Sequence, residues 1–134
     1  MKTVLFVDDD EAFRDLCRRI FEDEGYRVVL AQDGMQAIDA VVAKSPDVAI
    51  LDVRMPRMGG LEVAEEINGI DPKVPIILYT ANDEACTMDP RTRYASACIA
   101  KSSDFTELTL AVNRVLSLGG HRNVFRFGLP RAPE

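Results

Sequence analysis

Three consecutive carboxylates, Asp8, Asp9 and Asp10, follow the first apolar run of the sequence. Like charges this close raise one another's pKa and oppose folding unless a cation, a helix N-terminus or water compensates them. Carboxylate oxygens are the ligands that Mg²⁺ prefers, whereas the first turn of a helix also favours acidic residues. The cluster alone therefore fits either a metal site or a helix start.

Later apolar runs also end in reactive side chains. Five runs have the length and the Val and Ile content of buried strands: residues 3–7, 27–31, 47–51, 74–79 and 97–100. Asp52 follows the third run, Thr80 the fourth and Lys101 the fifth, whereas the second ends in Ala31 and Gln32. A carboxylate that faces a metal can attack phosphorus, and a hydroxyl and an ammonium can hold phosphoryl oxygens.

Segments with helical periodicity alternate with these strands. Apolar residues recur three and four positions apart in four segments: residues 13–21, 35–42, 61–67 and 105–116. Asp33 and Asp104 are predicted N-caps, Gly25 ends the first helix, and Gly119 and Gly120 end the last. Strands that alternate with helices predict an α/β fold with a doubly wound parallel sheet.

The expected order of the five strands is 2-1-3-4-5, as in a flavodoxin-like sheet. In this order the four strands with reactive ends are neighbours about 4.8 Å apart, so Asp8, Asp9, Asp52, Thr80 and Lys101 converge on one crevice. The convergence favours a metal site for Asp8 and Asp9, while Asp10 is left to begin the first helix.

The segment before the last strand is less regular. Residues 83–93 carry Pro90 where a helix interior should run, which predicts a short or irregular fourth helix. We expect residues 1–119 to form one domain. Residues 120–134 contain three Arg and two Pro without a sustained helical period, and are expected to be a flexible C-terminal tail.

Composition limits the partners. The chain has 134 residues, 47% of them hydrophobic, and a net charge of −6, and it has no basic stripe, so a nucleic-acid partner is not expected. No apolar run approaches the length of a membrane span, and nothing at the N-terminus resembles a signal peptide. The three cysteines, without CxxC spacing, are expected to be free thiols of a reducing compartment, which predicts a cytoplasmic protein without a zinc site.

The motifs FVDDDEA, LDVRMPRMGGLE and YTA, with Lys101 after the last strand, resemble the receiver domain of two-component response regulators. The resemblance covers residues 3–118. It implies that Asp52 is the phosphoacceptor, that Asp8, Asp9, Asp52 and the backbone carbonyl of Arg54 bind Mg²⁺, and that Thr80 and Lys101 contact the phosphoryl group. It also implies that Met55 and Pro56 shape the loop after Asp52, that Gly60 begins the third helix, and that Arg54 and Asn82 tune dephosphorylation.

Three positions depart from the family pattern. Ser102 follows Lys101 where the family usually has proline, and Tyr94 stands where a glycine usually closes the fourth helix. Cys98, three residues before Lys101, occupies the switch position that is often aromatic. The usual coupling of Thr80 to an aromatic switch is therefore not carried over to this chain.

The resemblance implies a stand-alone receiver that takes a phosphoryl group from a histidine kinase or phosphotransfer protein and slowly hydrolyses it. It would then signal to a downstream protein target, and formation of a homodimer is a further possibility.

Two alternatives remain. One is a pseudo-receiver that interacts without being phosphorylated. The other is a haloacid-dehalogenase-type phosphatase that uses the DxD spacing of Asp8 and Asp10, although this interpretation leaves Asp52 without a role.

Overall fold

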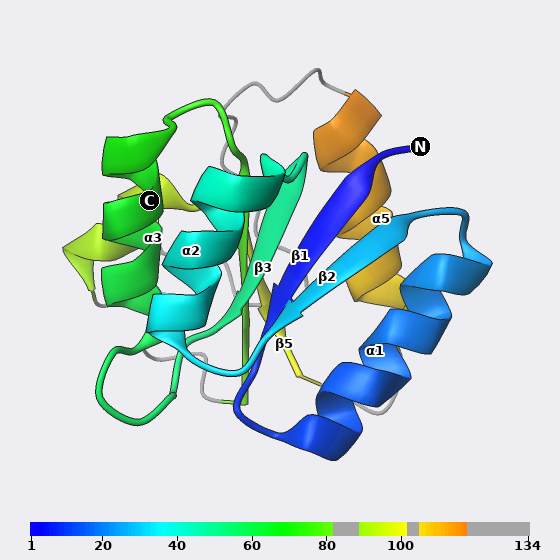
Figure 1. The fold of residues 1–134 in the computed structure, drawn as a ribbon, viewed down its shortest axis with the longest axis horizontal. Helices are drawn as coiled ribbons and strands as arrows, with labels where there is room; N and C mark the ends of the chain where they lie inside the picture. Colours follow the sequence, from blue (N-terminus) through cyan, green and yellow to red (C-terminus); the bar gives the residue numbers. More distant parts are fainter. Residues whose placement is uncertain (82–88, 102–104, 118–134) are drawn as a thin grey trace, which may run out of the picture.

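A five-stranded parallel sheet forms the centre of the computed structural model, which describes residues 1–81, 89–101 and 105–117 (Figure 1). The strands lie in the order β2-β1-β3-β4-β5, all parallel. Their bounds are β1 Thr3–Val7, β2 Arg27–Ala31, β3 Val48–Asp52, β4 Ile76–Thr80 and β5 Ala97–Ala100. The predicted α/β fold and strand order are confirmed.

The third and fourth strands lie slightly further along the chain than predicted. β3 and β4 cover residues 48–52 and 76–80, against the predicted 47–51 and 74–79. Pro75 has no N–H to donate to the sheet, so regular pairing of β4 starts at Ile76. The shift makes Asp52 and Thr80 the last residues of their strands, where the rigid sheet fixes their backbones.

The helices begin and end largely at the predicted signals. They are α1 Glu11–Asp23, α2 Gly34–Lys44, α3 Gly60–Ile70 and α5 Thr106–Ser117. The Asp33 carboxylate accepts a hydrogen bond from the Gln36 amide at 2.9 Å, as an N-cap should. Ser45 ends α2 in the left-handed region with φ 46°, just before Pro46. The predicted caps Asp104, Gly119 and Gly120 lie outside the described residues.

The sheet separates two apolar cores (Figure 1). α2 and α3 pack on one face, and α1 and α5 pack on the other. All five residues of β3 are buried, as expected for a central parallel strand covered by helices on both faces. Among the helices of the described residues, none combines the length and the hydrophobicity that a membrane span requires.

The predicted irregular fourth helix lies partly outside the described residues, which omit 82–88. Its described part is a short 3-10 helix, η1, at Pro90–Tyr94. The Asp89 carboxylate accepts hydrogen bonds from the backbone amide, Nε and Nη2 of Arg91 at 2.8, 3.1 and 2.8 Å. Pro90 occupies the first turn, where its missing N–H costs no intrahelical bond.

Candidate functional site

Three carboxylates gather at the carboxyl end of the sheet. Asp8 and Asp9 follow β1, and Asp52 ends the neighbouring strand β3. Each offers an oxygen, and these oxygens lie within 4.8 Å of one another. Asp8 and Asp52 are buried, whereas Asp9 is exposed to solvent. A set of carboxylate oxygens with one open side fits a hard divalent cation such as Mg²⁺.

Asp8 is fixed by several hydrogen bonds. Its amide donates to the carbonyl of Ala31 in β2 at 3.1 Å, and its carbonyl accepts from the Arg14 guanidinium at 2.7 Å. Its Oδ1 accepts from the Asp10 amide at 2.9 Å. These contacts tie the end of β1 to β2 and α1, so the direction of this carboxylate is set by backbone geometry.

The Lys101 ammonium lies between two of the carboxylates. Its Nζ is 2.8 Å from Asp8 Oδ2 and 3.3 Å from Asp52 Oδ2. Burial alone would lower the pKa of Lys101, but the hydrogen bond to Asp8 and the charges of Asp52 and Asp8 outweigh it, so the pKa is raised. The ammonium therefore stays charged and compensates the two buried carboxylates.

The carboxylate of Asp52 is less stable in its ionised form than an ordinary one. Burial raises its pKa, and the negative charge of Asp8 raises it further. The charge of Lys101 and the hydrogen bond from the Arg54 amide, 3.2 Å from Oδ1, oppose this rise without cancelling it. A cation bound beside Asp52 would favour its ionised, nucleophilic form.

The remaining predicted site residues lie in different places. Thr80 is fully buried at the end of β4, and its carbonyl accepts from the Lys101 amide at 2.7 Å. Arg54 follows β3 with an exposed side chain. Asn82 lies outside the described residues. Cys98 is buried beside Leu78 in the core under α2 and α3.

The cysteines differ from one another. Cys17 is free and buried, and burial raises the pKa of its thiol to about 12. Cys98 is disulfide-bonded, with its partner outside the described residues, so the expectation of a free thiol there is wrong. Spacing in the sequence did not reveal this bond, because a disulfide depends on which side chains the fold brings together.

Asp10 belongs to the start of α1, as predicted. The Asp10 carboxylate accepts a hydrogen bond from the Phe13 amide at 3.2 Å and caps the helix, and Glu11 lies in its first turn. Asp10 is exposed and is not part of the carboxylate cluster. A DxD mechanism needs Asp10 to face the reacting group beside Asp8, so helix capping disfavours the dehalogenase-type alternative.

The loop after Asp52 packs closely against its neighbours. Gly60, the first residue of α3, lies so near β3 that a Cβ there would be 2.3 Å from the Asp52 carbonyl oxygen. A Cβ on Gly34 would be 2.8 Å from the Met58 sulfur. This loop is therefore held between α2 and α3, and a hollow of about 200 Å³ beside it is lined by Asp9, Gln32, Asp33, Pro56 and Arg57.

Aromatic rings border the other side of the Lys101 ammonium. Nζ lies 4.7 Å from the centroid of the Phe13 ring and 6.0 Å from that of Tyr79. The Phe13 and Tyr79 rings are stacked with centroids 5.9 Å apart. Helical periodicity places Phe13 on the apolar face of α1, but it gives no signal that this ring meets an ammonium.

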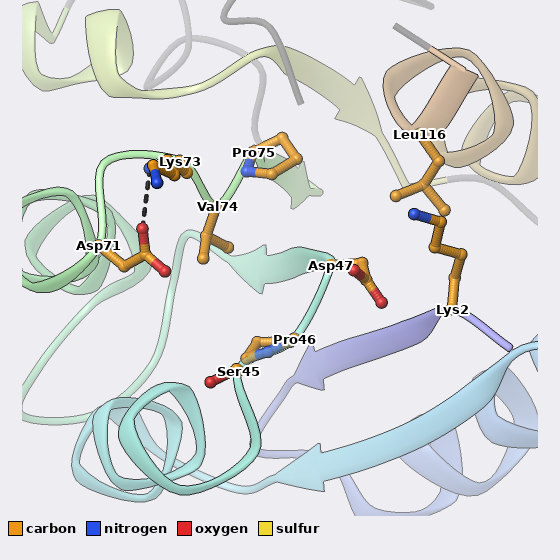
Figure 2. A pocket seen from close by; sticks show the side chains of 9 residues that line it. All are labelled: Lys2, Ser45, Pro46, Asp47, Asp71, Lys73, Val74, Pro75 and Leu116. Carbon is orange, nitrogen blue, oxygen red and sulfur yellow. Dashed lines mark hydrogen bonds between the residues drawn. The ribbon is translucent and has the colours of Figure 1, made fainter. Parts of the chain in front are cut away.

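A larger hollow lies at the opposite end of the sheet (Figure 2). It measures about 300 Å³ and is lined by Lys2, Ser45, Pro46, Asp47, Asp71, Lys73, Val74, Pro75 and Leu116. Its two aspartates and two lysines face a mixture of apolar groups, and none of the predicted site residues lines it. The chemistry therefore concentrates at the carboxyl ends of the strands, as in other open α/β sheets.

Comparison with known proteins points to one family. The family model of the response regulator receiver domain matches residues 4–113. Response regulator MprA of Mycobacterium tuberculosis is 45% identical over 80 residues, which are 60% of this chain and 35% of MprA. This chain thus matches about a third of the length of that relative.

Solved structures agree with this match. The response regulator TrrA of Thermotoga maritima, in complex with Mg²⁺ and BeF, has a TM-score of 0.82 and 35% identity, over 86% of this chain and 99% of that one. TrrA in complex with the histidine kinase ThkA gives a TM-score of 0.80 and 35% identity, over 87% of this chain and 99% of that one.

Proposed function

Because this chain belongs to the response regulator receiver domain family, we propose that it accepts a phosphoryl group on Asp52 in a Mg²⁺-dependent reaction. The observation that carries the proposal is the convergence of Asp8, Asp9 and Asp52 with the Lys101 ammonium. Three carboxylates and one ammonium at adjoining strand ends can bind a divalent cation and leave one carboxylate as nucleophile.

The transfer step is an in-line displacement at phosphorus. An oxygen of Asp52 forms a bond to phosphorus, while the bond from phosphorus to the donor nitrogen of a phosphohistidine breaks. The electron pair of that bond stays on the imidazole, and the product is an acyl phosphate. Lys101 neutralises charge on the phosphoryl oxygens, and the Thr80 hydroxyl binds one of them.

Asp8, Asp9, Asp52 and the backbone carbonyl of Arg54 would hold the metal. When bound, Mg²⁺ neutralises charge on the phosphoryl oxygens and on the clustered carboxylates. Asp8 already has a fixed direction through Arg14 and Asp10, so it needs little reorganisation to serve as a ligand. In this proposal Arg54 and Asn82 set how fast water hydrolyses the acyl phosphate.

The donor is proposed to be a histidine kinase or a phosphotransfer protein, and the signal passes to a protein target. TrrA, a structural relative, is known in complex with the histidine kinase ThkA. We propose that residues 1–119 act as the receiver domain. Since Cys98 replaces the usual aromatic switch, the phosphorylated state is read out by a route other than a swinging ring.

Incubation with Mg²⁺ and a small acyl phosphate, followed by intact mass measurement and peptide mapping, tests the proposal. We expect one phosphoryl adduct, on Asp52, that is lost in Asp52→Asn and when the metal is chelated. Asp10→Asn is the matched control, because Asp10 caps α1 outside the cluster, and it should retain the adduct.

Other outcomes would favour the alternatives. No adduct with either a small donor or a kinase would identify a pseudo-receiver. Phosphatase turnover that is lost in Asp8→Asn but retained in Asp52→Asn would overturn the receiver mechanism in favour of the dehalogenase-type one.

A further inference from the structure

The ammonium of Lys101 has two different kinds of neighbour. Asp8 and Asp52 hold it through charge at 2.8 and 3.3 Å, and the Phe13 ring lies 4.7 Å from it. Ring faces carry partial negative charge and attract cations within about 6 Å of their centroid. The side chain of Lys101 is only 22% exposed, so water weakens this attraction less than it would at an open surface.

The Phe13 ring is itself held in place by other aromatic side chains. Its centroid lies 6.0 Å from that of Phe6, 5.9 Å from that of Tyr79 and 5.6 Å from that of Phe105. These rings come from β1, from β4 and from the residue before α5. The contacts restrict the position of the ring, so it can serve as a fixed wall for the flexible lysine side chain.

We propose that Phe13 is a positioning residue that holds the Lys101 ammonium beside Asp52 through a cation–π contact. The inference rests on the proposed function, in which Lys101 contacts the transferred phosphoryl group. During transfer Asp52 forms a covalent bond, and Asp8 would serve as a metal ligand, so both carboxylates change their interaction with Lys101. The ring does not take part in that exchange, and it keeps the ammonium from moving into solvent while its anionic partners change.

A purely apolar role for Phe13 predicts something different. If the ring only fills space between α1, β4 and α5, leucine should replace most of its contribution and tyrosine should bring no benefit. A positioning role needs an aromatic face, which tyrosine retains and leucine lacks. Phe21 is the matched control, because it is a fully buried ring on the same helix that packs against the Tyr26 ring, 6.0 Å between centroids.

The first measurement needs no phosphorylation. In NMR spectra of the metal-free protein, the side-chain protons of Lys101 next to Nζ should show an upfield ring-current shift. Most of this shift should be lost in Phe13→Leu, where only the more distant Tyr79 ring remains, and it should persist in Phe13→Tyr and Phe21→Leu. An unshifted Lys101 in the unchanged protein, or a shift that is undiminished in Phe13→Leu, would overturn the inference even if Asp52 is phosphorylated normally.

The second measurement is the rate of adduct formation on Asp52 at saturating Mg²⁺. Phe13→Leu should slow it about three- to tenfold, as expected for a partly desolvated cation–π contact, and Phe13→Tyr should stay within about twofold of the unchanged protein. Equal slowing in Phe13→Leu and Phe21→Leu, or no rescue by tyrosine, would refute the positioning role. If Phe13→Leu does not fold, Phe13→Met replaces it as the non-aromatic variant. Absence of any adduct in the unchanged protein would instead refute the proposed function.

Discussion

Replacement of Gly60 by alanine should displace Asp52 through a clash with its backbone. The new Cβ would lie 2.3 Å from the Asp52 carbonyl oxygen and 2.8 Å from its carbonyl carbon. Real Cβ atoms essentially never come closer than 3.0 Å to a heavy atom outside their own stretch of chain, so α3 or the end of β3 must retreat by about 0.7 Å. Both neighbouring atoms belong to the backbone of Asp52, the proposed phosphoacceptor, and a rotamer change cannot move them aside.

The expected cost combines overpacking with misplacement of Asp52. Overpacking of a well-packed core typically destabilises by about 1–3 kcal/mol, and part of the shift falls on the carboxylate that contacts Lys101 and that is proposed to bind the metal. We expect Gly60→Ala to lower the urea midpoint and to slow adduct formation on Asp52 about tenfold or more.

Gly69→Ala on the same helix is the matched control. A Cβ there meets nothing within 4 Å, and alanine is favoured over glycine in a helix by about 0.5–1 kcal/mol. It should raise the urea midpoint slightly and leave the adduct rate unchanged. If Gly60→Ala matched Gly69→Ala in both assays, neither stability nor adduct formation would depend on the close approach of α3 to Asp52, and the prediction would be refuted.

Three further predictions concern charge and burial. Asp52→Asn should raise the thermal midpoint of the metal-free protein at pH 7, because the raised pKa of Asp52 means that its ionisation destabilises the folded state. This gain should vanish at a pH below 3.8, the ordinary pKa of an aspartate, where the carboxyl group is protonated in both the folded and the unfolded state. Arg91→Gln should move the pKa of Asp89, which the hydrogen bonds and charge of Arg91 hold below its usual range, up towards normal in a carboxyl NMR titration; an unchanged titration would show that these contacts do not form in solution. Cys17, with a pKa near 12, should resist alkylation at pH 8 in the native protein and react after unfolding, as peptide mapping would reveal.

The sequence predicted the carboxylate cluster because strand register is simple. Residues that end neighbouring parallel strands must meet at one edge of the sheet, so Asp8 and Asp52 could be brought together without knowledge of any side-chain contact. Asp10 and Asp33 were predictable for a similar reason, since N-capping depends on local spacing.

Other features depend on contacts that periodicity does not encode. The spacing of apolar residues in α1 places Phe13 on the apolar face. The distance of its ring from Lys101, however, depends on how α1 packs against the sheet and on where β5 ends. The disulfide of Cys98 and the contact of Gly60 with the Asp52 backbone are likewise properties of the assembled structure. The starts of β3 and β4 were misjudged by one and two residues, because apolar residues that precede a strand look like part of it.

The ion pair of Lys101 with Asp8 spans 93 residues, and this separation affects the order in which the chain can fold. Pairing of β1 with β3 brings Asp8 and Asp52 together after about fifty residues of chain, whereas the compensating ammonium arrives only with β5, near the end of the sheet. A partly folded chain that lacks β5 therefore carries an uncompensated pair of buried charges, which makes it costly to populate. The charges of the site thus penalise incomplete sheets and add to the cooperativity of folding, and a divalent cation in the medium would relieve that penalty before the last strand has docked.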